Sequence, residues 1–268
     1  MLSTQSAIEL AKEMHDAHAN ERQDLDTLRL YSTGRQRMPL VIPPDAPGEV
    51  RELARLSRIN IIGIVLKALV ESLYLDNIRK VEDDQADPAV EDGAGDDTLS
   101  RLWRVWLANR MNRRQGGLYR AAFEYSFSYL AISPGDPMPV MRPVSPRSMF
   151  ALYAEDADWP SRTMERRRGG YRIQVVGDEG VEVADLLRDE RDEWVVARQA
   201  VLGLDYIPVV RYVPEEDLDS DDEPESQTFG IRWRNEVQIT GGEVAPLMTL
   251  QDQADVDTFT LKSAQWYA

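Results

Sequence analysis

The segment LSRLWRVWLANRMNRRQGGLYRAAFEYSFSYLAISPGDPMPVMRPVSP, residues Leu99–Pro146, decides the fold class. Apolar side chains in its first part recur at i, i+3, i+4 and i+7, the spacing of an amphipathic helix: Leu99, Leu102, Trp103, Trp106 and Leu107. Gly116 and Gly117 interrupt this pattern, and aromatic residues resume helical spacing from Leu118. We therefore expect two successive helices that are separated near the glycines.

The same segment ends in a pattern typical of a β-hairpin. From Tyr125 to Ile132 the composition shifts to Tyr, Phe and Ile, which favour strands. A turn follows at 133–137, where proline fixes φ and glycine permits a positive φ, and 138–144 returns as a second strand. A helix pair that leads into a hairpin indicates an α+β fold, and the segment contains no catalytic motif.

The N-terminal part of the chain is predicted to be helical. We expect a first helix over 5–30, with Ser6 and Glu9 forming a capping box, and a break at 31–36 followed by a proline-rich connector. A short helix is expected over 49–57. Asn60 then caps an apolar helix that runs to Leu75 and precedes a short strand over 78–81.

The C-terminal part is predicted to consist mainly of strands. Strands are expected over 148–154, 171–176, 181–187, 194–200 and 206–213. Gly177–Gly180 is a hairpin turn, and Pro208 places the last of these strands at a sheet edge because proline cannot donate to the ladder. Residues 229–239 read as irregular or extended, and a final helix is expected from Thr249 to Ala268, which looks cut off as if the sequence continued.

The acidity of the chain is concentrated in two segments. The formal net charge of the 268 residues is −16, but residues 82–97 and 215–225 each hold eight acidic residues and no basic one. The remaining 31 acidic residues balance the 31 lysines and arginines. Both segments are expected to be solvated loops, and the near-neutral body argues against a protein that mimics DNA by its overall charge.

Few residues favour metal or catalytic chemistry. There is no cysteine, and His15 and His18 lie three apart on the first helix with no third ligand nearby, so we interpret them as solvated surface residues. The aspartates Asp217, Asp219, Asp221 and Asp222 lack the glycine and the closing glutamate of an EF-hand. We expect no metal and no cofactor. A hydrolase that uses a carboxylate pair stays open as a minor alternative, because 47 acidic residues offer many pairs.

Arginines are the more informative charged residues. Residues 101–120 contain six arginines and no acidic residue, interleaved with Trp103, Trp106 and Tyr119, and a second basic patch lies at 166–168. Such a surface could bind a nucleic-acid backbone or the carboxylates of a neighbouring protein. The alternative is that the arginines line a solvated face while the tryptophans fill the core. The most apolar run, 61–74, carries Lys67 and Glu71 and is too short to span a membrane, so no membrane contact is expected.

The order of short motifs along the chain resembles that of a known family. The motifs are Tyr31-x-x-Gly34-Arg35-Gln36, an apolar helix from Asn60, the tryptophan-rich helix, FEYSFSYLAI, Val144-Ser145-Pro146, Leu202-Gly203 with Pro208-Val209-Val210, and Pro246-Leu247-x-x-Leu250-Gln251-Asp252. This succession is similar to portal proteins of tailed bacteriophages, particularly those of phages that infect actinobacteria. The resemblance covers residues 5–268.

The resemblance implies a structural, non-enzymatic subunit of the virion. Portal proteins form a ring, normally of twelve subunits, at one vertex of the capsid, and double-stranded DNA passes through it. By this resemblance 1–30 is an N-terminal helix, 31–245 is the α+β wing domain and 246–268 begins the stem helix. The family's clip, second stem helix and crown are absent from this chain. Assembly in the host cytoplasm and contact with the major capsid protein are implied, as are contacts of the terminase and the head–tail adaptor with the parts not in this chain.

Arginines that face a neighbouring subunit's carboxylates would fix the register of such a ring. Our candidate subunit-contact residues are Arg101, Arg104, Arg110, Arg113, Arg114, Arg166, Arg167 and Arg168. Charge reversal of the last three is expected to weaken ring assembly measured by sizing. The main alternative is another phage or host assembly protein with only incidental DNA contact.

Overall fold

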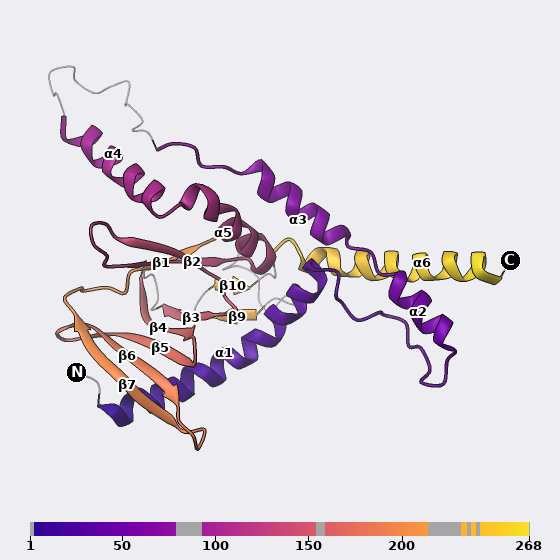
Figure 1. Ribbon diagram of the computed structural model, residues 1–268, viewed down its shortest axis with the longest axis horizontal. Coiled ribbons are helices and arrows are strands. Elements are labelled where there is room, and N and C mark those ends of the chain that lie inside the picture. Colours follow the sequence, from indigo (N-terminus) through magenta and orange to yellow (C-terminus); the bar gives the residue numbers. More distant parts are fainter. Residues whose placement is uncertain are drawn as a thin grey trace.

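The computed structural model describes residues 3–78, 93–153, 159–213, 232–234, 237–239 and 242–267. Its helices are α1 (Thr4–Ser32), α2 (Gly48–Leu56), α3 (Ile61–Ser72), α4 (Gly93–Ala108), α5 (Met111–Tyr125), the 3₁₀ turn η2 (Ala245–Leu247) and α6 (Met248–Tyr267). Its strands are β1 (Ser128–Ser133), β2 (Val140–Val144), β3 (Met149–Tyr153), β4 (Pro160–Arg167), β5 (Gly170–Gly177), β6 (Gly180–Arg188), β7 (Trp194–Leu202), β8 (Val209–Tyr212), β9 (Arg232–Arg234) and β10 (Val237–Ile239). The predicted α+β class is confirmed (Figure 1).

A five-stranded antiparallel meander, β3 to β7 in sequence order, forms the larger sheet. Helix α1 covers one face of this sheet (Figure 1). Residues of α1 at helical spacing, including Ala7, Ala11 and Met14, pack there against Phe150 of β3 and Ile173 of β5. The periodicity of α1 and the alternation of the strands therefore bury one shared core.

The other face of the meander is partly covered by a three-stranded sheet of order β2-β1-β8. Phe127, Tyr129 and Val144 pack there against Met149 and Val181 of the larger sheet. Strand β8 lies at the edge of its sheet, as Pro208 predicts, and the Pro208 carbonyl accepts the N–H of Ile132 at 2.8 Å. The central hairpin and the edge strand are thus both confirmed.

The helices differ from prediction in where they begin and end. The break between α4 and α5 falls at Arg110, which has a left-handed backbone (φ 55°), and both Gly116 and Gly117 lie inside α5. The Asn109 side chain explains the position, because its amide donates to Pro139 O and accepts from Met141 N, both at 2.8 Å. These bonds tie the end of α4 to the start of β2, and the glycines have only a modest cost inside a helix.

Two caps show where local sequence signals hold and fail. Asn60 caps α3 as predicted, its Oδ1 accepting the N–H of Gly63 at 2.8 Å, although α3 ends at Ser72 and not at Leu75. Helix α1 is capped by Ser3, whose hydroxyl oxygen accepts the N–H of Ser6 at 3.0 Å, so the predicted box of Ser6 and Glu9 is wrong.

Several predicted segments lie partly or wholly outside the described residues. Ile78 lies outside any strand, and 79–81 lie outside the described residues. The same holds for 82–92 and for the whole of 215–225, which includes the four aspartates Asp217, Asp219, Asp221 and Asp222. Residues 93–97, predicted as loop, instead begin α4.

Candidate assembly surface at the root of α6

The base of α6 is fixed to the preceding helices by buried side-chain hydrogen bonds. The Gln251 amide accepts the backbone N–H of Ile61 at 2.9 Å and donates to the carbonyl of Ile59 at 2.6 Å. The Asp255 carboxylate accepts the N–H of Ile59 at 2.9 Å and the Gln36 amide at 2.8 Å. We call Gln36, Ile59, Gln251 and Asp255 the α6 root.

The local sequence explains why these groups meet. The first N–H groups of a helix have no partner within that helix. Asn60 satisfies the N–H of Gly63 in α3, and Gln251 satisfies that of Ile61. Gln251 and Asp255 lie one turn apart on α6 and therefore present their side chains to the same neighbour. The α6 root thus joins the start of α3 to the start of α6.

Because the α6 root is buried, its polar groups require hydrogen-bond partners in well-defined positions. Asp255 is 0% exposed and Gln251 is 1% exposed. A carboxylate so far from water is costly unless several donors surround it, so the orientation of α6 depends on these directional bonds. Tyr31 adds a bond at the rim, its hydroxyl donating to Asp252 at 2.9 Å. Burial and this carboxylate both favour the protonated phenol and raise the pKa of Tyr31 to about 12.

An apolar cluster lies beside the α6 root. Leu25 and Leu28 of α1 pack there with Ile62 and Leu66 of α3, and with Val244 just before η2. These side chains are nearly inaccessible to water. The cluster holds the C-terminal half of α1, the start of α3 and the approach to α6 as one packed unit.

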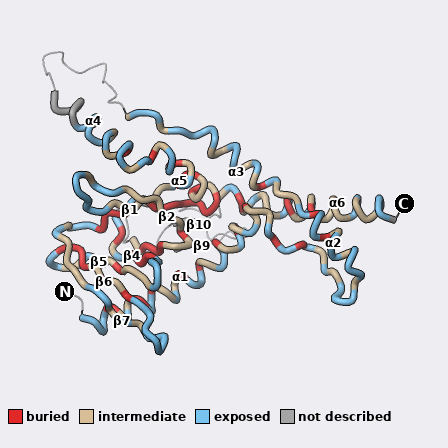
Figure 2. The backbone as a smooth tube through the Cα atoms, in the orientation of Figure 1, coloured by how far each residue is buried: buried red, intermediate tan, exposed pale blue. Residues whose placement is uncertain are grey.

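Beyond its root, α6 projects from the body along the long axis of the molecule (Figure 1). Large apolar side chains on it face solvent: Leu250 is 61%, Leu261 61% and Trp266 64% exposed. Figure 2 shows little buried surface along this part of α6. Its neighbour there is α2, where the Leu56 carbonyl accepts the Lys262 ammonium. A helix this exposed obtains little stabilisation from its own chain.

The candidate arginines on α4 and α5 are all exposed. Arg101 and Arg104 lie on α4, Arg110 lies at the break, and Arg113 and Arg114 lie on the first turn of α5. The helices bury Trp106 and half-bury Trp103, whose rings stack 6.4 Å apart between centroids. The predicted apolar face of α4 is only partly covered, because Leu102 and Leu107 remain exposed.

The arginines at 166–168 lie on a different element, at the end of β4 and in the turn to β5. All three are exposed, but Arg167 bonds the buried carboxylate of Glu165 at 2.8 Å. Desolvation and the neighbouring arginines lower the pKa of Arg167, opposed by Glu165. Arg166 and Arg168 are therefore better candidates for a subunit contact than Arg167.

Glu165 belongs to a charge ladder that sequence reasoning missed. Glu165, Arg172, Asp185 and Arg198 are direct cross-strand partners on β4, β5, β6 and β7. Arg172 binds Asp185 with two bonds of 2.7 and 2.9 Å, which lowers the pKa of the Asp185 carboxyl. The sequence indicates such a ladder where charged residues alternate with apolar ones along the strands. Strand β4 was not predicted because its arginines were interpreted as a basic patch.

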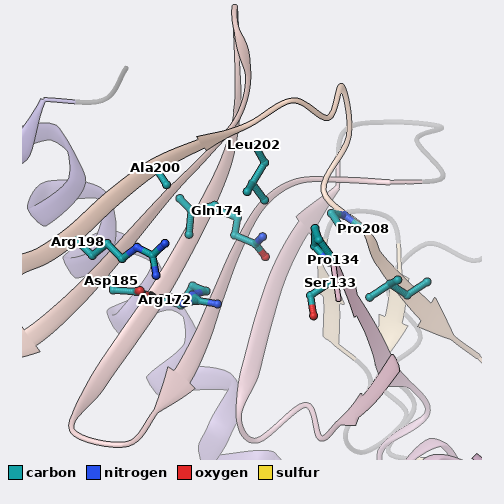
Figure 3. A pocket seen from close by; sticks show the side chains of 11 residues that line it. Ser133, Pro134, Arg172, Gln174, Asp185, Arg198, Ala200, Leu202 and Pro208 are labelled. Carbon is teal, nitrogen blue, oxygen red and sulfur yellow. Dashed lines mark hydrogen bonds and ion pairs between the residues drawn. The ribbon is translucent and has the colours of Figure 1, made fainter. Parts of the chain in front are cut away.

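Part of this ladder lines an open cleft of about 280 Å³ between the two sheets. Figure 3 shows Arg172, Asp185 and Arg198 together on the larger sheet, with Ser133 and Pro134 on the facing wall. The charges there largely pair with one another. We interpret the cleft as a consequence of how the sheets diverge and assign it no ligand.

The interpretation of both histidines as solvated surface residues is wrong. His18 is buried, and one ring nitrogen lies 2.9 Å from the carbonyl oxygen of Pro146. His15 is half-buried, with its ring edge-on to Tyr171. Both lie on or beside the face of α1 that packs on the body. Among the described residues, no group of three or more His, Cys, Asp or Glu side chains is arranged to hold a metal ion.

Sequence reasoning found part of the α6 root. Gln36 and Gln251 belong to the motifs that carry the resemblance, whereas Asp255 was missed, although it lies one turn after Gln251. No helix in the described part of the chain is both long and apolar enough to cross a membrane. No protein-family model matches the sequence, and no curated protein matches it.

Proposed function

We propose that this chain is a subunit of the portal ring of a tailed bacteriophage. In this role it contributes the shape and contacts of a DNA channel at one capsid vertex and performs no bond-making chemistry. The body of each chain forms one segment of the ring wall, and α6 begins the stem that faces the channel. Double-stranded DNA would pass without sequence-specific contact, which agrees with a body whose charges nearly balance.

The observation that carries this proposal is the composition of the α6 root. Three motifs of the resemblance, from distant parts of the sequence, meet there: the segment that ends at Gln36, the helix start at Asn60 and the pair Gln251-Asp252. Order along a sequence alone is weak support. Direct hydrogen bonds between the regions that carry the motifs give that order a physical reason, because together they set the direction in which α6 leaves the body.

The exposed apolar residues of α6 support the same role. Burying a large apolar side chain contributes about 1.5–3 kcal/mol, so covering Leu261 and Trp266 would strengthen each contact between copies. A ring repeats that contact once for every subunit. Helix α6 is therefore expected to be covered by the neighbouring copies of itself.

The test is the assembly state of the full chain by native mass spectrometry and negative-stain electron microscopy. The wild-type chain is expected to form closed rings of about twelve copies. Leu261→Asp and Trp266→Asp should each raise the concentration needed for half-assembly about tenfold or more, because about 1.4 kcal/mol per contact corresponds to a factor of ten.

Val41→Asp is the matched control, since Val41 is 93% exposed and lies in the connector between α1 and α2, outside α6. This variant should assemble like the wild type. A wild-type chain that stays monomeric up to its solubility limit would refute the proposal. So would open chains without closure, or turnover of a substrate that a single substitution abolishes.

A further inference from the structure

The outer face of α1 carries an acidic stripe. Glu9, Glu13 and Asp16 are spaced i, i+4 and i+7, and Asp24 continues the same face two turns later. Lys12 is the exposed basic residue beside them, so the stripe keeps a net negative charge. All four acidic residues are exposed, and the side chain of Asp16 is 86% exposed. The opposite face of the helix is the one that packs on the larger sheet. We call these four residues the acidic stripe.

The start of α5 carries the opposite charge. Arg110, Arg113 and Arg114 are all exposed there, and residues 98–120 contain no aspartate or glutamate. Within the described chain, Arg110, Arg113 and Arg114 have no carboxylate partner. Guanidinium groups bind carboxylates with paired, directional bonds, so this surface suits an acidic protein partner. We call these three arginines the basic face.

The two surfaces lie on opposite edges of the molecule. Figure 1 shows α4 and the start of α5 above the sheets and the N-terminal half of α1 below them, so neither surface can reach the other within one chain. A two-fold pair that met through either surface would bring like charges together. Contact between the acidic stripe of one copy and the basic face of the next instead uses both surfaces, the head-to-tail arrangement from which a ring is built when its rotation closes.

We propose that the acidic stripe of one copy docks on the basic face of the next copy. The proposal rests on the portal function and adds to it which two surfaces meet around the ring. Exposed charge pairs are individually weak and are screened by salt. The contact therefore sets the register and the rate of encounter between subunits, while apolar contacts such as those of α6 supply most of the affinity.

A charge-exchange experiment tests the pairing. One variant, Glu13→Lys with Asp16→Lys, makes the stripe basic, and another, Arg113→Glu with Arg114→Glu, makes the basic face acidic. All four side chains are exposed, so both variants are expected to fold, which circular dichroism and thermal unfolding verify. Each variant alone is expected to assemble at least tenfold more weakly than the wild type at low salt.

An equal mixture of the two variants should recover assembly. Each contact in the mixture joins one variant to the other, so native mass spectrometry should show rings with both in equal number. The chain that carries all four substitutions should also assemble alone. Asp178→Lys with Glu179→Lys, in the exposed turn between β5 and β6, changes the net charge as much as the stripe variant does and should leave assembly unchanged.

The outcomes separate this inference from the portal proposal. Wild-type rings whose assembly neither variant weakens would overturn the pairing and leave the portal function standing. Failure of the mixture to recover assembly would overturn it as well. A wild-type chain that forms no ring contradicts the portal function. In that case, analytical ultracentrifugation of the two variants at low salt decides whether the acidic stripe and the basic face bind each other. The absence of binding refutes the pairing.

Discussion

Replacing Asp255 tests whether the α6 root works as described. In Asp255→Ala the N–H of Ile59 loses its partner, and Gln36 loses its bond of 2.8 Å and keeps only a long one of 3.4 Å to the Ile59 carbonyl. The Gln251 amide loses its bond of 3.1 Å to Asp255 and retains the one of 2.6 Å to the Ile59 carbonyl. One buried donor is thus left unsatisfied, and the amides of Gln36 and Gln251 each lose one of their bonds.

The size of the effect follows from these losses. An unsatisfied buried donor costs about 1–3 kcal/mol, so Asp255→Ala should lower the free energy of unfolding by about 2–4 kcal/mol. Asp255→Asn should cost much less, about 1 kcal/mol. Its carbonyl oxygen can still accept the N–H of Ile59. Its amide can donate to Gln36, because the buried Oε1 of Gln36 has no partner and would turn toward it.

Urea denaturation of both variants measures the difference in their free energies of unfolding. The comparison requires that the unfolding free energy of each variant depends on urea concentration with the same slope. Amide-resolved hydrogen exchange locates it, since the Ile59 amide should lose protection in Asp255→Ala and keep most of it in Asp255→Asn. The reasoning is refuted if the two variants are equally destabilised, or if Asp255→Ala loses less than about 1 kcal/mol.

Three further predictions follow from single contacts. The raised pKa of Tyr31 means that the unfolded phenol loses its proton first, so the unfolding free energy of the wild type should fall between about pH 10 and 12, and that of Tyr31→Phe should fall less in the same titration. The lowered pKa of Asp185, caused first by its bond from Arg172, stabilises the fold above about pH 4. The difference in unfolding free energy between the wild type and Asp185→Asn should therefore narrow as the pH falls below about 4. Gly180 has φ +116°, and a Cβ there would lie 2.5 Å from a backbone carbonyl oxygen. Gly180→Ala should therefore lower the melting temperature and reduce the free energy of unfolding by about 1–3 kcal/mol. Gly203 has open space around it, so Gly203→Ala should change the free energy of unfolding little.

Periodicity predicted most of the fold because it reports burial directly. The strands from β5 to β8 and the helix capped by Asn60 follow alternation, turn and cap signals that are local in sequence. The break between α4 and α5 could not be located in this way. Its position depends on the Asn109 amide, whose partners lie 30 and 32 residues away in the hairpin.

Polar residues that pair over long distances were the main source of error. His18 reads as a surface residue until the carbonyl of Pro146 is brought to it by the fold. Strand β4 was missed because its arginines indicate a basic surface patch, whereas in the fold Arg142 and Arg167 pair with Glu165 and make its buried position tolerable. The candidate arginines, by contrast, required only that charged residues stay exposed, and the structure places all eight on the surface.

The charge ladder across the larger sheet has a consequence for how accurately the sheet forms. An antiparallel meander can misalign by two residues without moving any side chain to the wrong face. Here such a slip between β5 and β6 would set Arg172 opposite Val183 or Leu187 and leave Asp185 without its guanidinium. A hairpin in the wrong register therefore has an electrostatic cost that apolar residues alone would not impose. The charge ladder thus favours the native register over registers shifted by two residues.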